Sequence, residues 1–195
     1  MRSSEHGAAL VDLVAACGIM AVVAAVTIPS IQASRDQDEA RMAARYLAQR
    51  IQTLRVQAVR RNRMVAMRFD PDDLGRMGAY VDGDGDGVLE RDIDRGVDTA
   101  IEVEARLANY FRGAQLWVRL DVPLPEGGGT LASGSDPVRI GSTNLLSFSP
   151  LGSATSGTIY VAARSGPQMC VRVLGATGRV RVLWFDATSG AWRQD

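Results

Sequence analysis

The chain has 195 residues, a length that suits one globular domain with an additional segment. Its 46% hydrophobic and 23% charged residues are typical of a folded protein. All 22 basic residues are arginines, and the only histidine is His6. This composition excludes a Schiff-base lysine, the lysine of a phosphate-binding loop and a multi-histidine metal site, so we expect that the protein is not an enzyme.

Charge is distributed unevenly although the net charge is zero. Residues 35–68 carry nine arginines against three acids, whereas residues 69–106 carry twelve acids against four arginines. A basic segment therefore precedes an acidic one. This pattern does not fit a uniformly basic protein that coats nucleic acid.

Residues 13–34 form a tract without any charge. A helix of about 20 apolar residues spans the hydrocarbon core of a bilayer, so the tract predicts a transmembrane helix. A cleaved secretory signal would have a shorter apolar region and several preceding positive charges, whereas only Arg2 precedes this one. Pro29 removes one helical hydrogen bond, and we expect a bend there.

A single apolar stripe continues beyond this tract at alternating spacings of four and three residues. Its members are Ala40, Ala44, Leu47, Ile51, Leu54 and Ala58. This spacing places them on one face of a helix. We therefore predict one helix of about 50 residues, apolar all round in its first half and amphipathic in its second.

Short runs of alternating polarity follow, separated by glycine, proline and serine clusters. They cover residues 64–69, 79–81, 115–120, 138–140, 145–148, 158–163, 169–174 and 179–185. The last three lie close together with short connections, which indicates an antiparallel meander. The predicted fold class is α+β, with the long N-terminal helix packed on a C-terminal antiparallel β-sheet head.

The N-terminal segment Gly7-Ala8-Ala9-Leu10-Val11-Asp12, followed by an apolar helix with Pro29, resembles the processing signal of type IV pilins and pseudopilins. In that family a short leader ends in glycine, a prepilin peptidase cuts after it, and the new N-terminus is methylated. An acid follows at the fifth mature position and a proline at the twenty-second. With Ala8 as the first mature residue, Asp12 is the fifth and Pro29 the twenty-second.

The resemblance extends to the C-terminal half. The segments 148–161 and 176–182 are similar to the minor pseudopilin GspH and its pilus relative FimT. The implied organisation is a leader at 1–7, a transmembrane assembly helix at 8–34, an amphipathic extension at 35–63 and a β-rich periplasmic head at 64–195.

The function implied is that of a minor pseudopilin, a structural subunit of the periplasmic pseudopilus in type II protein secretion. Such a subunit crosses the inner membrane once and assembles through its N-terminal helix. Its implied partners are other pilin-like subunits, the prepilin peptidase, the membrane and the secreted substrate.

Two positions depart from the family. The first mature residue is Ala8 rather than an aromatic residue or methionine, and the fifth is Asp12 rather than glutamate. Asp12 keeps the carboxylate, which in the family pairs with the N-terminal ammonium of a neighbouring subunit. The competing interpretation is that Asp12 only marks the membrane boundary. The arginines after the tract outnumber Arg2, so a plain charge count predicts an orientation opposite to that of the family.

The alternative function is that of a minor type IV pilin, similar to FimT, in pilus assembly or DNA uptake. Arg60, Arg61 and Arg63 would then contact DNA phosphates. Grooves that follow single strands also use aromatic rings, and Tyr46 is the only aromatic residue between 35 and 68. A solvated basic helix face is the competing interpretation.

A calcium site is the only cofactor site that the sequence suggests. Asp82, Asp84 and Asp86 occupy positions 1, 3 and 5 of an EF-hand-like loop. Val88 would offer its carbonyl at position 7 and Glu90 its carboxylate at position 9. Position 12, normally a bidentate glutamate, is isoleucine, so binding would be weak. The alternative is a solvated acidic turn.

Overall fold

The computed structural model describes residues 3–70, 72–73 and 75–195, without the side chains of residues 3–12 and 24–33. The chain divides into two compact units, residues 1–35 and 36–195, and each is considered by itself. Within the residues so described, no helical stretch combines the length and apolar character needed to cross a bilayer.

One helix, α1, extends over Ser3–Arg61, which confirms the prediction of a single long helix. It ends where Asn62 adopts a positive φ of 50°, a left-handed conformation that asparagine tolerates better than most residues. Arg60 and Arg61 lie in the last turn, where positive charge is favourable beside the exposed carbonyl groups.

Two antiparallel sheets follow, where the sequence suggested one. The four-stranded sheet has, in spatial order, β3 (Thr99–Arg106), β2 (Arg76–Val81), β1 (Val65–Phe69) and β8 (Leu145–Phe148). The six-stranded sheet has β12 (Ala191–Gln194), β11 (Arg179–Asp186), β10 (Met169–Leu174), β9 (Gly157–Ala163) and β4 (Ala114–Leu116), with β7 (Val138–Ile140) also paired to β9. The predicted meander is confirmed as β9, β10 and β11.

Three short elements complete the head. A hairpin of β5 (Val122–Pro123) and β6 (Thr130–Leu131) packs with the β9–β10 face through the cluster of Val122, Leu131 and Tyr160. Helix α2 (Glu90–Asp94) precedes β3, and the 3-10 turn η1 (Leu107–Asn109) follows it.

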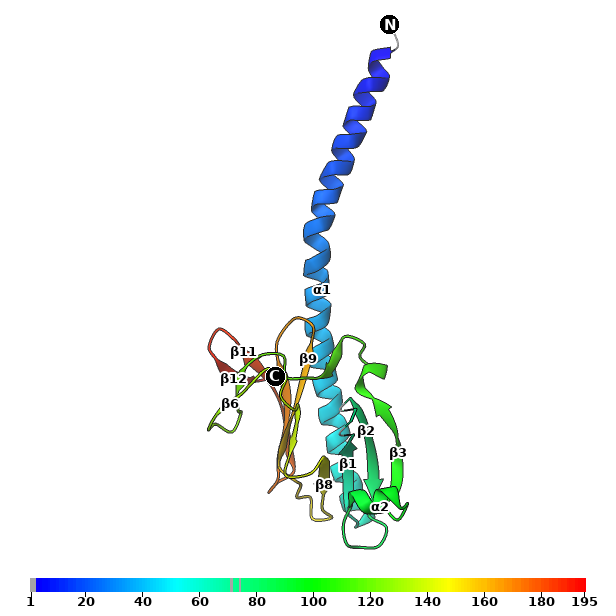
Figure 1. Cartoon of the computed structure of the whole chain (residues 1–195), viewed down its shortest axis with the longest axis vertical. Helices are drawn as coiled ribbons and strands as arrows, with labels where there is room; N and C mark the ends of the chain where they lie inside the picture. Colours follow the sequence, from blue (N-terminus) through cyan, green and yellow to red (C-terminus); the bar gives the residue numbers. More distant parts are fainter. Residues whose placement is uncertain (1–2, 71, 74) are drawn as a thin grey trace. The chain divides into compact units, whose positions relative to one another are not determined.

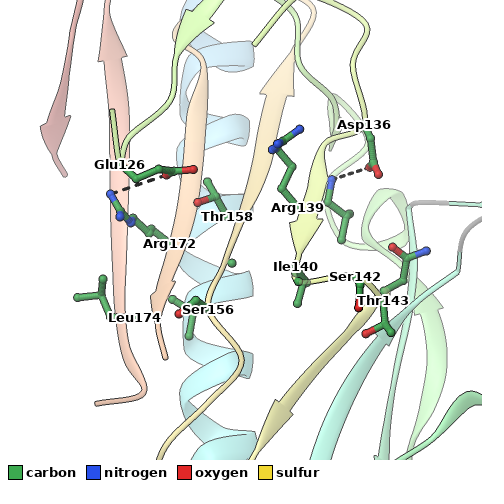
Figure 2. Close-up of a pocket in the computed structure, with 15 residues that line it drawn as sticks. Glu126, Asp136, Arg139, Ile140, Ser142, Thr143, Ser156, Thr158, Arg172 and Leu174 are labelled. Carbon is green, nitrogen blue, oxygen red and sulfur yellow. Dashed lines mark hydrogen bonds and ion pairs between the residues drawn. The ribbon is translucent and has the colours of Figure 1, made fainter. Parts of the chain in front are cut away.

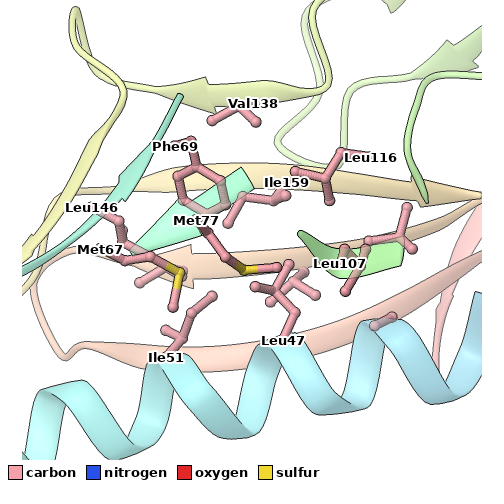
Figure 3. Packing of buried hydrophobic residues seen from close by; sticks show 14 of the residues in the cluster. Leu47, Ile51, Met67, Phe69, Met77, Leu107, Leu116, Val138, Leu146 and Ile159 are labelled. Atoms are coloured by element: carbon pink, nitrogen blue, oxygen red, sulfur yellow. The ribbon is translucent and has the colours of Figure 1, made fainter. Parts of the chain in front are cut away.

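The part of α1 within residues 36–61 packs against both sheets, which lie to either side of its cyan section (Figure 1). All six residues of the predicted stripe are completely buried. Figure 3 shows Leu47 and Ile51 directed at residues from both sheets, among them Met67, Met77 and Ile159. Burying each such aliphatic side chain stabilises the head by about 1.5–3 kcal/mol, so this stripe is the main attachment of the helix.

The strand predicted at 115–120 is shorter, because β4 ends at Leu116. Beyond it the backbone bonds to the buried side chain of Gln168, whose Oε1 accepts the N–H of Arg119 at 2.8 Å. The Nε2 of Gln168 donates to the carbonyl of Trp117 at 2.9 Å. The side chain of Gln168 therefore provides the hydrogen bonds that a neighbouring strand would otherwise provide after Leu116.

Candidate functional site

The residues predicted for processing and assembly are Gly7, Ala8, Asp12 and Pro29. They lie outside the residues whose side chains the structure describes. Their roles remain predictions from the sequence, as does the bend at Pro29.

The two C-terminal segments that resemble GspH meet on the helix. The side chain of Arg55 donates from Nε to the carbonyl oxygen of Gly152, at 2.9 Å. Gly152 and Gly178 both have positive φ, 83° and 59°. A Cβ on Gly178 would lie 2.4 Å from the Gly152 oxygen and 2.6 Å from Arg55 Nε. Both glycines are therefore required where two turns close over one arginine.

Ion pairs and hydrogen bonds fix the beginning of this helical section. The carboxylate of Asp195 lies 2.8 Å from Nε of Arg41 and 2.7 Å from Nε of Arg45. Asp36 accepts hydrogen bonds from the backbone N–H and the hydroxyl of Ser165, at 3.2 and 2.8 Å. The helix from residue 36 onward is thus joined to Asp195, which follows β12, and to the turn between β9 and β10.

The three arginines proposed for DNA binding lie at or just beyond the end of α1 and are all exposed. Arg63 donates from Nη1 to the carbonyl oxygens of Asp82 and Gly83, each at 2.9 Å. Arg60 and Arg61 line a shallow depression with Gln57. Arg63 therefore stabilises the acidic loop of its own chain by hydrogen bonds.

The predicted calcium loop connects β2 to α2. Carboxylate oxygens of Asp82, Asp84 and Asp86 all lie within 4.8 Å of one another. Asp82 is buried, and it accepts backbone N–H groups of Asp84 at 3.2 Å and Gly85 at 2.7 Å. Partial desolvation and the neighbouring Asp84 carboxylate raise the pKa of Asp86. Three converging carboxylates have the chemistry to hold a hard cation.

Of the other two predicted ligands, Glu90 pairs with Arg68 at 2.8 Å. The side chain of Val88 is buried in an apolar cluster, and the role of its backbone carbonyl as a ligand stays a prediction. Asp98 was not among the predicted residues, but it is 2% exposed and accepts the N–H groups of Gly83 at 3.0 Å and Leu89 at 2.9 Å. Asp98 therefore holds the loop in place through hydrogen bonds, although it lies outside the loop in the sequence. Its spacing from the loop residues gives no indication of this role.

A hollow of about 610 Å³ lies on the six-stranded sheet, a feature that the sequence did not predict. It is lined by β7, β9, β10, the loop 141–144 and Glu126 from the β5–β6 turn. Figure 2 shows Arg139 and Arg172 on the strands to either side of Thr158. Hydroxyl, guanidinium and carboxylate groups dominate its walls, so it suits a polar ligand.

The sequence of this chain matches a known protein family. The sequence model described as Type II transport protein GspH matches residues 43–178, more than two thirds of the chain. The chain belongs to this family. The GspH match includes Arg55, Gly152, Gly178 and the whole hollow, and it confirms the resemblance found in the sequence. A family of transport proteins also confirms that the chain is not an enzyme.

Two solved structures resemble this GspH-family chain. Both are of the minor pseudopilin EpsH from the type II secretion system of Vibrio cholerae. One is 18% identical, with a TM-score of 0.45, and the match covers 75% of this chain and 97% of that chain. The other is 16% identical, with a TM-score of 0.41, and the match covers 81% and 94%. No curated protein matches the chain.

Proposed function

We propose that this chain is a minor pseudopilin, a structural subunit of the periplasmic pseudopilus in type II protein secretion. The family match over residues 43–178 carries this proposal. The N-terminal signal supports it independently, because Gly7, Asp12 and Pro29 stand at the family's spacing in a part of the chain that the match does not reach.

In this proposal the tract at 13–34 anchors the precursor in the inner membrane, and residues 64–195 lie in the periplasm. A prepilin peptidase removes residues 1–7 and the N-terminus of Ala8 is methylated. Glycine suits the position before the cut, because a side chain there would obstruct close approach of the enzyme to the backbone.

Exposed apolar residues on α1 support assembly through the helix. In the first unit Leu13, Val14, Ile19 and Met20 are each 63–68% exposed. An apolar surface of this kind requires lipid or other helices to cover it. The neighbouring subunits of a pseudopilus would supply such helices after the subunit leaves the membrane.

The alternative, a FimT-like pilin that binds DNA through Arg60, Arg61 and Arg63, is not favoured. The matched family is one of type II transport proteins. Arg63 also donates from Nη1 to two carbonyl oxygens of its own chain, so part of its hydrogen-bonding capacity is used there.

The test is to express the full chain with a prepilin peptidase and the other pseudopilins of a type II system. Mass spectrometry of the mature protein should show loss of residues 1–7 and a methylated Ala8. Gly7→Leu should remain as uncleaved precursor and should not cross-link to the other subunits. Gly18→Leu is the matched control, because it adds the same bulk to α1 outside the cleavage site and has no neighbouring atom within 4 Å. Retention of residues 1–7 in the unmodified chain, despite active peptidase, would contradict the proposal.

A further inference from the structure

A row of arginines crosses the six-stranded sheet. Arg139 on β7 is directly opposite Thr158 on β9, which is opposite Arg172 on β10, which is opposite Arg181 on β11. The adjacent positions, such as Ile159 and Val171, belong to the core beside α1. Because side chains alternate between the faces of a sheet, the arginine row is on the face turned away from α1.

This row has too few acidic partners. Arg172 and Arg181 are directly opposite each other, and like charges in that arrangement are destabilising. The nearest acid, Glu126, is 3.9 Å from Arg172, a long ion pair. Arg139 is exposed and has no ion pair among the described residues, and Nε of Arg181 is buried without a hydrogen-bond partner. An additional anion would relieve this imbalance.

The hollow lies over Arg139, Thr158 and Arg172 of this row, whereas Arg181 is not part of its lining, and it offers further hydrogen-bonding groups. Ser142, Thr143, Asn144 and Ser156 contribute to its walls beside Arg139 and Arg172 (Figure 2). Two residues along β9 from Thr158, the hydroxyl of Tyr160 is fully buried without a partner. Burial raises the pKa of Tyr160, and the charges of Glu126, Arg139 and Arg172 contribute less.

The walls also select among anions. Among the described residues that line the hollow none is aromatic, so bases of a nucleic acid would have no ring to stack on. Two wall residues, Glu126 and Asp136, are acids, and they would repel a polyanion more than a single charge. Asp136 is already engaged, because it accepts the N–H of Val138 at 2.8 Å.

We propose that this hollow binds a peptide segment of another protein through one acidic side chain, whose carboxylate pairs with Arg139 and Arg172 over Thr158. The polar wall residues bond to the peptide on either side of that acid. This binding site is on the face of the sheet turned away from α1, so the proposal does not rest on assembly through the helix.

Glu126 acts as an internal competitor in this arrangement. It lies in the turn between β5 and β6, next to Gly127 and Gly128, which both have positive φ. Figure 2 shows its carboxylate beside Arg172, joined to it by the long ion pair. An incoming carboxylate would replace this contact, so removal of the Glu126 charge should strengthen binding.

The experiment uses the full chain, labelled with nitrogen-15, in an uncharged detergent. The probe is the blocked peptide acetyl-Gly-Ser-Glu-Ser-Gly-amide, and the matched probe replaces Glu with Gln. NMR of the arginine Nε–H groups, assigned with Arg139→Gln and Arg172→Gln, reports binding. The Glu peptide should shift both signals and bind about tenfold more tightly than the Gln peptide, as expected for a charge-assisted hydrogen bond.

Variants make the test specific. Glu126→Gln should bind the Glu peptide about threefold more tightly, and Arg139→Gln or Arg172→Gln should weaken binding by a similar or larger factor. Arg112→Gln, which removes another exposed arginine, should bind like the unmodified chain. Equal binding of the two peptides, or no gain from Glu126→Gln, would overturn the proposal.

Two competing probes distinguish other anions. Inorganic phosphate that binds as tightly as the peptide would identify a nonspecific anion site and overturn the proposal. If a single-stranded thymidine oligonucleotide shifted the same signals at a lower concentration than the peptide, the ligand would be nucleic acid. This result would also overturn the proposal. Cleavage after Gly7 and pseudopilus assembly would be unaffected in the Arg139→Gln and Arg172→Gln variants, so failure here is distinguishable from failure of the proposed function.

Discussion

Arg55 on helix α1 donates a hydrogen bond from Nε to the carbonyl oxygen of Gly152, in the turn between β8 and β9, at 2.9 Å. The same side chain lies against Gly178, in the turn between β10 and β11. One residue of the helix therefore contacts both the connection between the two sheets and a turn of the six-stranded sheet. This contact gives a physical reason for the glycines in the segments that resemble GspH.

Replacing Gly178 by alanine should destabilise the head. The new Cβ would lie 2.4 Å from the Gly152 oxygen and 2.6 Å from Arg55 Nε, and the residue has φ of 59°. Overpacking and a left-handed alanine together should lower the free energy of unfolding by about 2–4 kcal/mol. Urea unfolding of the full chain, followed by tryptophan fluorescence, measures this loss.

Gly190→Ala is the control for Gly178→Ala. Its φ is 64°, but no atom lies within 4 Å of the added Cβ, so only the conformational cost of about 1 kcal/mol should remain. Equal losses in the two variants would mean that the contact with Arg55 and Gly152 contributes nothing.

The helix and many strands could be predicted because their signals are local. The stripe from Ala40 to Ala58 follows the helical period, and the strands Val138–Ile140, Leu145–Phe148 and Met169–Leu174 have the predicted bounds. Strand β3 was missed although residues 101–105 alternate between apolar and acidic side chains. It forms an edge of its sheet, its register against β2 is interrupted by a bulge, and Val103 is 89% exposed.

The polar sites could not be predicted for a different reason. Arg139 is far in the sequence from Arg172 and Arg181, and the three residues form one row only through the register of four strands. Asp98 likewise reaches the loop that begins at Asp82 because β2 and β3 pair. Sequence spacing contains no information on such register, whereas the acidic cluster Asp82–Asp86 is local and was found.

Cys170 should be unreactive in the folded chain. It is completely buried, and burial raises the pKa of its thiol, so the reactive thiolate is scarce. In a Cys17→Ser background, a disulfide reagent should react with Cys170 at least about a thousandfold more slowly before than after unfolding in urea, because the core must open first. Raising the pH from 7 to 9 should accelerate the reaction of folded Cys170 only slightly.

An exposed thiol provides the comparison for Cys170. Leu151 is 95% exposed, so Leu151→Cys in a background without the two native cysteines should react rapidly and accelerate with pH as an ordinary thiol does. If native Cys170 reacted at the rate of this variant, the hairpin of β5 and β6 would not be closed over the sheet.

Calcium binding by the loop at Asp82 stays a prediction, and calorimetry of the full chain tests it. With position 12 lacking a carboxylate, the dissociation constant should be in the range of about 10⁻⁴–10⁻³ M. Calcium should raise the melting temperature, and a chelator should reverse the rise. Asp84→Asn with Asp86→Asn should abolish both effects while leaving Asp82, which folds the loop, in place.

The control for the calcium experiment is Asp94→Asn. Asp94 is an exposed acid close to the loop, but it lies outside the group of three carboxylates and is 3.7 Å from Arg68. The Asp94→Asn variant should bind calcium like the unmodified chain. If the unmodified chain gave no heat at millimolar calcium, or if Asp94→Asn lost calcium binding as completely as the double variant, the loop would be an acidic turn held by its own hydrogen bonds.

Asp12→Ala should leave membrane insertion intact but impair assembly. Removing a carboxylate makes the N-terminal segment more apolar, so the amount resistant to carbonate extraction should not fall. The resemblance to pilins implies that Asp12 pairs with the N-terminal ammonium of a neighbouring subunit, and such a pair is strongest in a low-dielectric environment. Cross-linking to other pseudopilins should therefore fall about tenfold or more, since a buried charge without its partner costs several kcal/mol. Asp12→Glu, which keeps the charge with one more methylene, should assemble at least as well as the unmodified chain because its reach is longer. Normal assembly of Asp12→Ala would mean that Asp12 only marks the membrane boundary.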